Sequence, residues 1–306
     1  MDRPFASVVI VGAGAVGCEY ASIFAAIGIQ VWLVELSDRL LPLFDAEIAN
    51  LLASSLRASG IELLLGTRVT GVAHDGTGSV VDVDGGRDVQ AENLLFVAGR
   101  IGNTEGLGLE DAGVAVDAGH RIVVDEHYRT TAEGVLAAGD VIGPPGLASV
   151  SMEQARVAVG HAFGFPLKKA VDRMAPIAIY TIPEAASVGM TEDAAQRAGL
   201  DFEAGRGWFE KNTRAAIAGD REGLVKLVFE RSTGRLLGVH ILGTDAAELV
   251  HVGQAVLRHG GDISEFIDTT FNLPTRSEAY KYAAYDGLSR VEVRAAFGDV
   301  APSLGP

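Results

Sequence analysis

Three glycines near the N-terminus stand at a spacing that suits phosphate binding. Gly12, Gly14 and Gly17 form Gly-x-Gly-x-x-Gly between an apolar run at residues 6–11 and an apolar-periodic segment at residues 15–27. The run predicts a buried parallel strand and the segment predicts a helix, with the glycines, and Val16 between them, at the join. A tight turn lets the backbone approach a pyrophosphate, which the helix N-terminus attracts. The sequence therefore predicts a dinucleotide-binding turn, and the alternative is a turn that only packs the helix on the sheet.

An acidic residue follows at the spacing expected for ribose recognition. Glu35 ends the strand predicted at residues 30–35, where a carboxylate accepts hydrogen bonds from the adenine ribose hydroxyls. A carboxylate about 4 Å from a 2'-phosphate would cost up to roughly 4 kcal/mol at an effective dielectric near 20. NAD is therefore favoured over NADP. Arg39, four residues on, could soften this repulsion, and Glu35 could instead be a solvated strand end.

The elements that position these residues predict an α/β, doubly wound nucleotide-binding domain over residues 1–100. A helix at residues 45–59 and a strand at 61–65 continue the alternation of strand and helix that is typical of a parallel sheet. From Val69 the apolar period changes to two, and three short strands with turns at Asp75-Gly76 and Gly85-Gly86 predict a β-meander before a strand at residues 93–98.

The rest of the chain predicts two further parts and a tail. Residues 101–172 offer strands at 122–124 and 135–138 and a helix at 152–163, without a closed pattern of their own. Residues 173–292 predict an α+β domain with strands at 225–229 and 236–242. A helix at residues 246–259 follows, with Asp245 as its N-cap and Gly260 at its end. Residues 293–306 predict a polar, frayed tail.

Composition excludes several classes of partner. The formal net charge of -15 over 306 residues argues against nucleic acid, because binding phosphates needs clustered cations. The apolar stretch from Phe5 to Cys18 could be mistaken for a signal peptide, but Asp2 cancels Arg3 and spaced glycines interrupt the run. We therefore expect no membrane association and a cytoplasmic location, which a single cysteine, Cys18, also fits. The seven histidines lack ligand spacing, so no metal site is expected.

Five motifs in a fixed order resemble the flavoprotein disulfide reductase superfamily, most closely its soluble pyridine nucleotide transhydrogenases. They are Val-Gly-Ala-Gly-Ala-Val-Gly-Cys-Glu-Tyr-Ala-Ser (11–22), Val-Ala-Gly-Arg-Ile-Gly-Asn-Thr (97–104), Ala-Ala-Gly-Asp-Val-Ile-Gly (137–143), Tyr-Thr-Ile-Pro-Glu-Ala-Ala-Ser-Val-Gly (180–189) and Thr-Thr-Phe-Asn-Leu-Pro-Thr-Arg-Ser-Glu-Ala-Tyr (269–280). The resemblance implies that residues 101–172 belong to an FAD-binding domain and that the C-terminal domain forms a homodimer, to which the apolar helix at 246–257 could contribute.

The resemblance also implies roles for single residues. Asp140 would hydrogen-bond the ribityl chain of the flavin, and Glu19 would lie near the nicotinamide. Backbone neighbours of the isoalloxazine ring would be Gly146, Leu147, Ala148 and Ser149, and backbone neighbours of the nicotinamide nucleotide would be Val69 and Gly99. Without the resemblance, Glu19 is an ordinary acid at a helix start and Asp140 an ordinary turn residue.

One departure from the superfamily bears on the reaction. Relatives that reduce disulfides carry a histidine where this chain has Leu273, in the loop Leu273-Pro274-Thr275-Arg276-Ser277-Glu278. Leucine cannot exchange protons, so acid catalysis on a dithiol is not supported although Glu278, the usual orienting partner, is retained. The soluble transhydrogenases also lack this histidine, because hydride passes between nicotinamides through the flavin with no thiol step. The alternative is a lipoamide dehydrogenase relative that has lost activity locally.

The resemblance places a second glycine-rich turn, for the ADP part of FAD, and the redox cysteines upstream of residue 1. The chain is therefore expected to carry an incomplete FAD site and to bind FAD weakly. The leading hypothesis is an FAD-dependent oxidoreductase that moves hydride between NADPH and NAD, with NAD or NADP as its nucleotides. The alternatives are an NADH-dependent lipoamide dehydrogenase or flavin reductase relative, and a non-catalytic module that binds NAD and dimerises.

Overall fold

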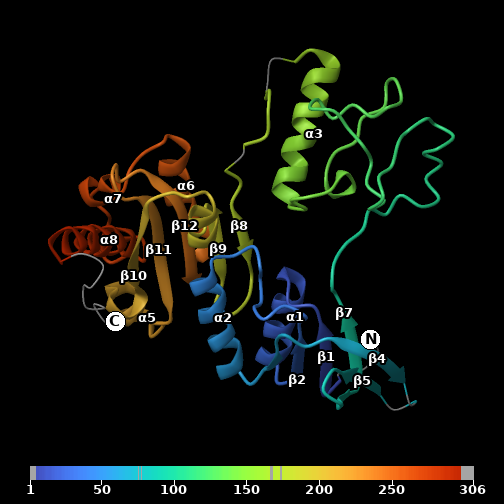
Figure 1. Cartoon of the computed structure of the whole chain (residues 1–306), viewed down its shortest axis with the longest axis horizontal. Helices are drawn as coiled ribbons and strands as arrows, with labels where there is room; N and C mark the ends of the chain where they lie inside the picture. Colours follow the sequence, from blue (N-terminus) through green and yellow to red (C-terminus); the bar gives the residue numbers. More distant parts are fainter. Residues whose placement is uncertain (1–4, 75, 77, 166–167, 173, 298–306) are drawn as a thin grey trace. The chain divides into compact units, whose positions relative to one another are not determined.

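A computed structural model describes residues 5–74, 76, 78–165, 168–172 and 174–297. The chain divides into two compact units (Figure 1). The first unit consists of residues 1–98 and 176–306, and the second unit of residues 99–175. The first unit therefore combines the N-terminal and the C-terminal parts of the sequence.

The N-terminal part of the first unit is built on a four-stranded parallel sheet. Its strands run in the order β3 (Glu62–Leu64), β2 (Gln30–Val34), β1 (Ser7–Val11) and β7 (Asn93–Phe96). Two helices, α1 (Ala15–Ala26) and α2 (Ala46–Ala58), connect the first three of them. The antiparallel meander of β4 (Val69–His74), β5 (Ser79–Val83) and β6 (Arg87–Ala91) precedes β7, as predicted, although Asp75 of its first turn lies outside the described residues.

Burial on both sheet faces explains the continuous apolar run of β1. Val8 and Ile10 belong to the core formed with α1 and α2, whereas Val9 and Val11 belong to a separate core formed with the meander. A strand covered on both faces has no position where a polar side chain reaches water, so its sequence shows no alternation. The doubly wound α/β fold and the meander are therefore confirmed.

The C-terminal part of the first unit is a five-stranded antiparallel sheet with helices packed on it. The strand order is β10 (Phe202–Trp208), β11 (Gly223–Glu230), β12 (Leu236–Gly243), β9 (Ala185–Gly189) and β8 (Ile177–Ile179). Its helices are α4 (Glu192–Arg197), α5 (Thr213–Ala218), α6 (Ala246–Arg258), α7 (Ser264–Asp268) and α8 (Glu278–Phe297), with a short 3-10 turn, η2 (Phe209–Lys211). Helix α6 packs on β12 and β9, and α8 packs on β10 and β11. This arrangement confirms the α+β character.

Two details of this part correct the sequence predictions. Asp245 is the N-cap residue of α6, as predicted, but it adopts a left-handed conformation (φ +65°), and its carboxylate pairs with Arg276 at 2.8 Å and makes no capping hydrogen bond. The carboxylate of Glu184, from the β8–β9 connection, instead accepts the Ala247 N–H at 3.1 Å. Helix α8 continues to Phe297 and so includes the first five residues of the expected tail, and the remainder of that tail lies outside the described residues.

The second unit contains one long helix, α3 (Ala148–Phe163), and a 3-10 turn, η1 (Asp140–Ile142). Helix α3 begins four residues before the predicted helix start at residue 152. The strands predicted at 122–124 and 135–138 were wrong, because among the described residues these segments form only the isolated bridges Val116–Ile122 and Arg129–Leu136.

Local hydrogen bonds limit the first of these segments, residues 122–124, from both sides. The carboxylate of Asp117 accepts two backbone N–H groups within the next four residues, at 2.8 and 2.9 Å, and Asp125 does the same at 2.8 and 2.9 Å. Such side-chain turns fold the backbone back on itself before a ladder can extend. The β-branched run at residues 122–124 lies between the Asp117 and Asp125 turns and pairs at one position only, Ile122 with Val116.

Candidate nucleotide-binding site

Two glycines of the fingerprint are required by the packing of the turn itself. Gly12 has φ +107°, and a Cβ there would lie 2.7 Å from the Val97 carbonyl oxygen of the neighbouring strand end. A Cβ on Gly17 would lie 1.8 Å from the Gly12 carbonyl oxygen. These glycines therefore bring α1 close to the sheet, which agrees with the packing alternative as well as with nucleotide binding.

Gly14 separates the two interpretations. A Cβ at Gly14 would meet no atom within 4 Å among the described residues, so packing within the chain does not require a glycine there. Gly14 is the N-cap of α1 and has no side chain that could cap the first N–H groups of the helix. Those donors and the positive end of the helix therefore face open space beside a bare backbone, with half-buried Val16 in the first turn. This cradle fits a diphosphate.

The carboxylate of Glu35 lies beside the glycine turn. Its Oε2 accepts the Ala13 N–H at 2.7 Å, and its Oε1 accepts the Ser37 N–H at 2.9 Å. Two backbone donors therefore fix the carboxylate between the turn and the loop that follows β2. A fixed, partly exposed carboxylate next to a diphosphate cradle is placed to accept ribose hydroxyls and to repel a 2'-phosphate.

Glu19 has a structural partner within the first unit. Its Oε1 accepts the Tyr180 N–H at 2.9 Å, and the Ser22 hydroxyl accepts the Ile182 N–H at 2.8 Å. The two contacts fasten the Tyr-Thr-Ile segment to α1. Tyr180 and Ile182 keep their side chains exposed, as does Tyr20 on α1. Glu19 therefore lies on a surface with exposed apolar side chains, and Val69 begins β4 elsewhere in the same unit.

The second unit carries the residues that the resemblance assigns to the flavin. Asp140 is half-exposed, and its Oδ2 pairs with Arg100 Nη1 at 3.0 Å while its Oδ1 accepts the Ser151 hydroxyl at 3.0 Å. The Gln154 amide oxygen accepts the Gly139 N–H at 2.7 Å and so anchors the turn. Gly99 (φ +153°) opens this unit.

The N-terminus of α3 faces the same carboxylate. Gly146 has φ +65°, and a Cβ there would approach Asp140 Oδ2 at 3.8 Å. Leu147 is the N-cap and cannot accept a hydrogen bond through its side chain, so no side-chain cap covers the first N–H groups of α3, from Ala148 and Ser149. A held carboxylate next to open helix donors fits the hydroxyl and carbonyl groups of a flavin. The Asp140 carboxylate and the helix N–H groups therefore have the chemistry expected of part of an FAD site.

The loop that differs from the disulfide-reducing relatives is exposed at its tip. The Leu273 side chain is 65% exposed, and Asn212 donates to the Thr275 carbonyl oxygen at 3.0 Å. Arg276 is nearly buried between Asp220, at 2.9 Å, and Asp245, at 2.8 Å. Glu278 opens α8. The loop is well anchored and presents an aliphatic side chain at the position of the usual acid.

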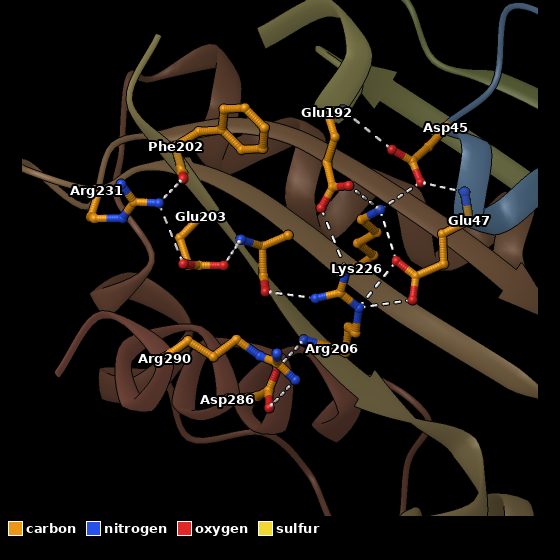
Figure 2. Close-up of polar contacts among 11 residues, drawn as sticks. Asp45, Glu47, Glu192, Phe202, Glu203, Arg206, Lys226, Arg231, Asp286 and Arg290 are labelled. Atoms are coloured by element: carbon orange, nitrogen blue, oxygen red, sulfur yellow. Dashed lines mark hydrogen bonds and ion pairs between the residues drawn. The ribbon is translucent and has the colours of Figure 1, made fainter. Parts of the chain in front are cut away.

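A buried charge cluster was not predicted from the sequence. Lys226 of β11 is fully buried, and its Nζ lies 2.6 Å from Asp45, 2.8 Å from Glu47 and 3.4 Å from Glu192 (Figure 2). Arg206 of β10 binds the same Glu47, at 2.8 Å, and Glu192, at 3.5 Å. The cluster therefore ties the start of α2 to the C-terminal sheet. A lysine flanked by Val225 and Leu227 in an apolar strand was the available signal, because a buried lysine requires a partner.

The ionisation of the cluster follows from its geometry. Burial alone would lower the pKa of Lys226, but the three carboxylates raise it above its ordinary value of 10.5. Burial would raise the pKa of Asp45, but the nearby His240 and Lys226 hold that pKa below its ordinary value of 3.8. Burial lowers the pKa of His240, which also faces Asp45. Lys226 therefore stays charged over a wider pH range than His240 and is the main cation that balances Asp45.

Other candidate groups carry no chemistry in this structure. Burial, with help from Glu35 and Glu19, raises the pKa of the Cys18 thiol to about 12, so Cys18 is an inert packed side chain. Within the described ranges, no cluster of three or more His, Cys, Asp or Glu side chains could hold a metal ion. None of the helices in the described part is long and apolar enough to cross a membrane.

Family models match nearly the whole chain. Residues 2–162 match the family described as pyridine nucleotide-disulphide oxidoreductase, and residues 175–284 match the dimerisation domain of that family. The chain belongs to this family. Its members include relatives named soluble pyridine nucleotide transhydrogenase, from Mycobacterium bovis (strain BCG / Pasteur 1173P2) and from Marinobacter nauticus (strain ATCC 700491 / DSM 11845 / VT8).

Both relatives are 42% identical to this family member, over 285 and 288 residues, and the alignments cover 93% of the chain. The chain spans 61% and 62% of the length of these curated relatives. Solved structures agree. An HOCl-induced flavoprotein disulfide reductase from Escherichia coli has a TM-score of 0.87 at 28% identity, covering 93% of this chain and 66% of that one. LpdA from Mycobacterium tuberculosis has a TM-score of 0.84 at 30% identity, covering 93% and 62%.

Proposed function

We propose that this chain binds nicotinamide dinucleotides at its glycine turn and forms part of a flavoprotein that moves hydride between NADPH and NAD. The observation that carries the proposal is the open cradle at Gly14. Among the described residues, packing does not require a glycine at this position, and the carboxylate of Glu35 is fixed beside it. The 42% identity to relatives named transhydrogenase supports the choice of reaction.

We further propose that the second unit contributes to an FAD site. Asp140, held by Arg100 and Ser151, would accept a ribityl hydroxyl, and the N–H groups of Ala148 and Ser149 would donate to the ring edge. FAD, when bound, supplies a carrier that takes up hydride from one nicotinamide and gives it to another. Leu273 would contribute no acid catalysis, since its side chain can neither donate nor accept a proton.

Transfer and binding are tested separately. Calorimetry with NADH and NADPH should detect binding to the purified chain, and the absence of heat with both would overturn the proposal. For transfer, the chain supplied with FAD is mixed with NADPH and a thionicotinamide analogue of NAD, whose reduction is followed by absorbance. We expect reduction of the analogue and no turnover of dihydrolipoamide. Dihydrolipoamide oxidation without nucleotide-to-nucleotide transfer would instead identify a lipoamide dehydrogenase relative.

The assembly that we propose is a homodimer in the cytoplasm. The dimerisation-domain match supports the dimer, although the apolar face of α6 is used inside the chain, where Leu249, Val250 and Leu257 are buried. Helix α8 is the better candidate for the interface, because Tyr282, Tyr285 and Leu288 are exposed on the face away from the sheet. Sedimentation equilibrium should give twice the chain mass, and a double charge substitution, Tyr282→Glu with Tyr285→Glu, should give the monomer.

A further inference from the structure

The loop between β2 and α2 borders the glycine turn along its length. The Ala13 N–H donates to Glu35 at its start, and the Leu41 N–H donates back to the Ala13 carbonyl oxygen at 3.0 Å. Any dinucleotide held by the turn therefore places its adenosine ribose against this loop. Arg39 lies within it, between the two anchor points.

Arg39 is paired with a carboxylate from the C-terminal part of the chain. Its Nη1 lies 3.2 Å from Asp193 Oδ2, and the two side chains are 27% and 41% exposed. Asp193 belongs to the first turn of α4, which is 154 residues away in sequence. Arg39, the cation that could soften the repulsion at the ribose site, is thus paired with a residue outside the nucleotide-binding part.

The buried charge cluster fixes Asp193 in that place. The residue before it, Glu192, donates its backbone N–H to Asp45 Oδ2 at 3.2 Å, and its carboxylate binds Lys226 and Arg206 (Figure 2). Asp45 is also the end of the loop that carries Arg39. The start of α4 and the end of the loop are therefore held together by contacts in which Lys226 and Asp45 are fully buried, and the Arg39–Asp193 pair forms at the rim of this contact.

The charges decide what this pair can do. A 2'-phosphate brings close to two negative charges next to Glu35, a repulsion that only a nearby cation can offset. A partly exposed ion pair contributes about 0–1 kcal/mol, so Arg39 can exchange one anion for another at small cost. A guanidinium that gains a phosphate dianion in place of a carboxylate gains the stronger partner. With NAD, Arg39 keeps Asp193 and Glu35 keeps the ribose hydroxyls.

We propose that Asp193 is a specificity-determining residue of the nucleotide site, because it competes with the 2'-phosphate of NADP for Arg39. The exchange would allow one site to accept both nucleotides of the proposed reaction, and in this respect the inference rests on the proposed function. Asp193 determines the relative affinity of the site for NAD and NADP, and the charge cluster around Lys226 holds Asp193 in position.

The test measures the Kd values of NAD and NADP for the purified chain by calorimetry at low salt. Arg39→Gln should weaken NADP about tenfold and leave NAD within about twofold, and Asp193→Asn should tighten NADP about threefold with NAD unchanged. In the Arg39→Gln background, Asp193→Asn should have no further effect on NADP. The differences should shrink at high salt because the pair is exposed.

Two matched substitutions control for general charge effects. Asp201→Asn removes an exposed carboxylate that is paired with Arg231 in the same C-terminal part, and Arg57→Gln removes an exposed arginine from α2. Both should leave the two Kd values unchanged. Thermal unfolding confirms that every variant is folded, which the exposure of Arg39 and Asp193 favours.

The outcomes distinguish this inference from the function on which it rests. If the unaltered chain binds neither nucleotide, the proposed function and the inference are both overturned. If it binds both nucleotides and the Arg39 and Asp193 variants bind NADP as the unaltered chain does, only the inference is overturned. Equal effects of Asp193→Asn on NAD and NADP, or an effect that persists without Arg39, would also overturn it.

Discussion

Replacing Lys226 with methionine should test the buried charge cluster directly. Methionine keeps most of the aliphatic volume and removes the cation that faces three carboxylates. Asp45 is 1% exposed and cannot regain water, whereas Glu47 and Glu192 are 27% and 34% exposed and can turn outward. Removing one partner from a buried pair costs about 3–5 kcal/mol, and one stranded carboxylate places Lys226→Met near the lower end of that range.

The loss should depend on pH with a definite sign. In the unaltered chain the pKa values of Asp45 and Glu47 lie below their ordinary values of 3.8 and 4.5, so the stability that they contribute is present above about pH 5 and is lost only at lower pH. The pKa of Lys226 is raised above 10.5, so its contribution is lost only at higher pH. In Lys226→Met, burial raises the pKa of Asp45, and proton uptake by Asp45 or His240 relieves the charge imbalance. The destabilisation should therefore be smaller at pH 5 than at pH 7.5.

Urea unfolding followed by tryptophan fluorescence measures this loss, since Trp32 of β2 and Trp208 of β10 report on both parts of the first unit. Adding Asp45→Asn to Lys226→Met should restore about half of the loss, because asparagine still caps α2 without a charge. Lys211→Met, at an exposed position, should change stability by less than about 0.5 kcal/mol. A loss below about 1 kcal/mol at pH 7.5, or one that is equal at both pH values, would refute the reasoning.

Three further predictions concern groups that the structure places plainly. Gly14→Ala should fold normally and weaken NADH binding at least tenfold in calorimetry, and normal NADH binding by this variant would contradict the proposed diphosphate site at Gly14. Gly17→Ala should lower the Tm or prevent folding, because its Cβ would lie 1.8 Å from the Gly12 carbonyl oxygen. Cys18, whose pKa is raised to about 12, should not react with a thiol reagent at pH 8 until the chain is unfolded in urea, and rapid labelling of the folded chain would contradict its burial. Tyr280→Phe removes a buried hydroxyl that bonds two backbone groups of α6 at 2.8 and 3.2 Å, and urea unfolding should show a loss of about 1–2 kcal/mol with unchanged nucleotide binding.

Local patterns determined much of this protein from its sequence. The buried run of β1, the glycine turn and the meander were predicted because strand burial, positive φ angles and tight turns are imposed by neighbouring residues. The family followed from motifs that run through the chain in order. Predictions that depended on a short apolar run alone failed at residues 122–124 and 135–138, whose backbone N–H groups donate to separate loop carbonyls instead of to one neighbouring strand.

Contacts between distant residues were decided only by the tertiary structure. The sequence places Lys226 in an apolar strand but does not say that Asp45, 181 residues away, balances its charge. It predicts Asp245 as the N-cap of α6 but not that the carboxylate of Glu184 accepts the Ala247 N–H at the start of that helix. Arg39 could be assigned to the ribose loop, yet its partner Asp193 comes from another part of the chain. The physical reason is that a charge brought out of water needs a partner in space, and the fold chooses that partner without regard to sequence separation.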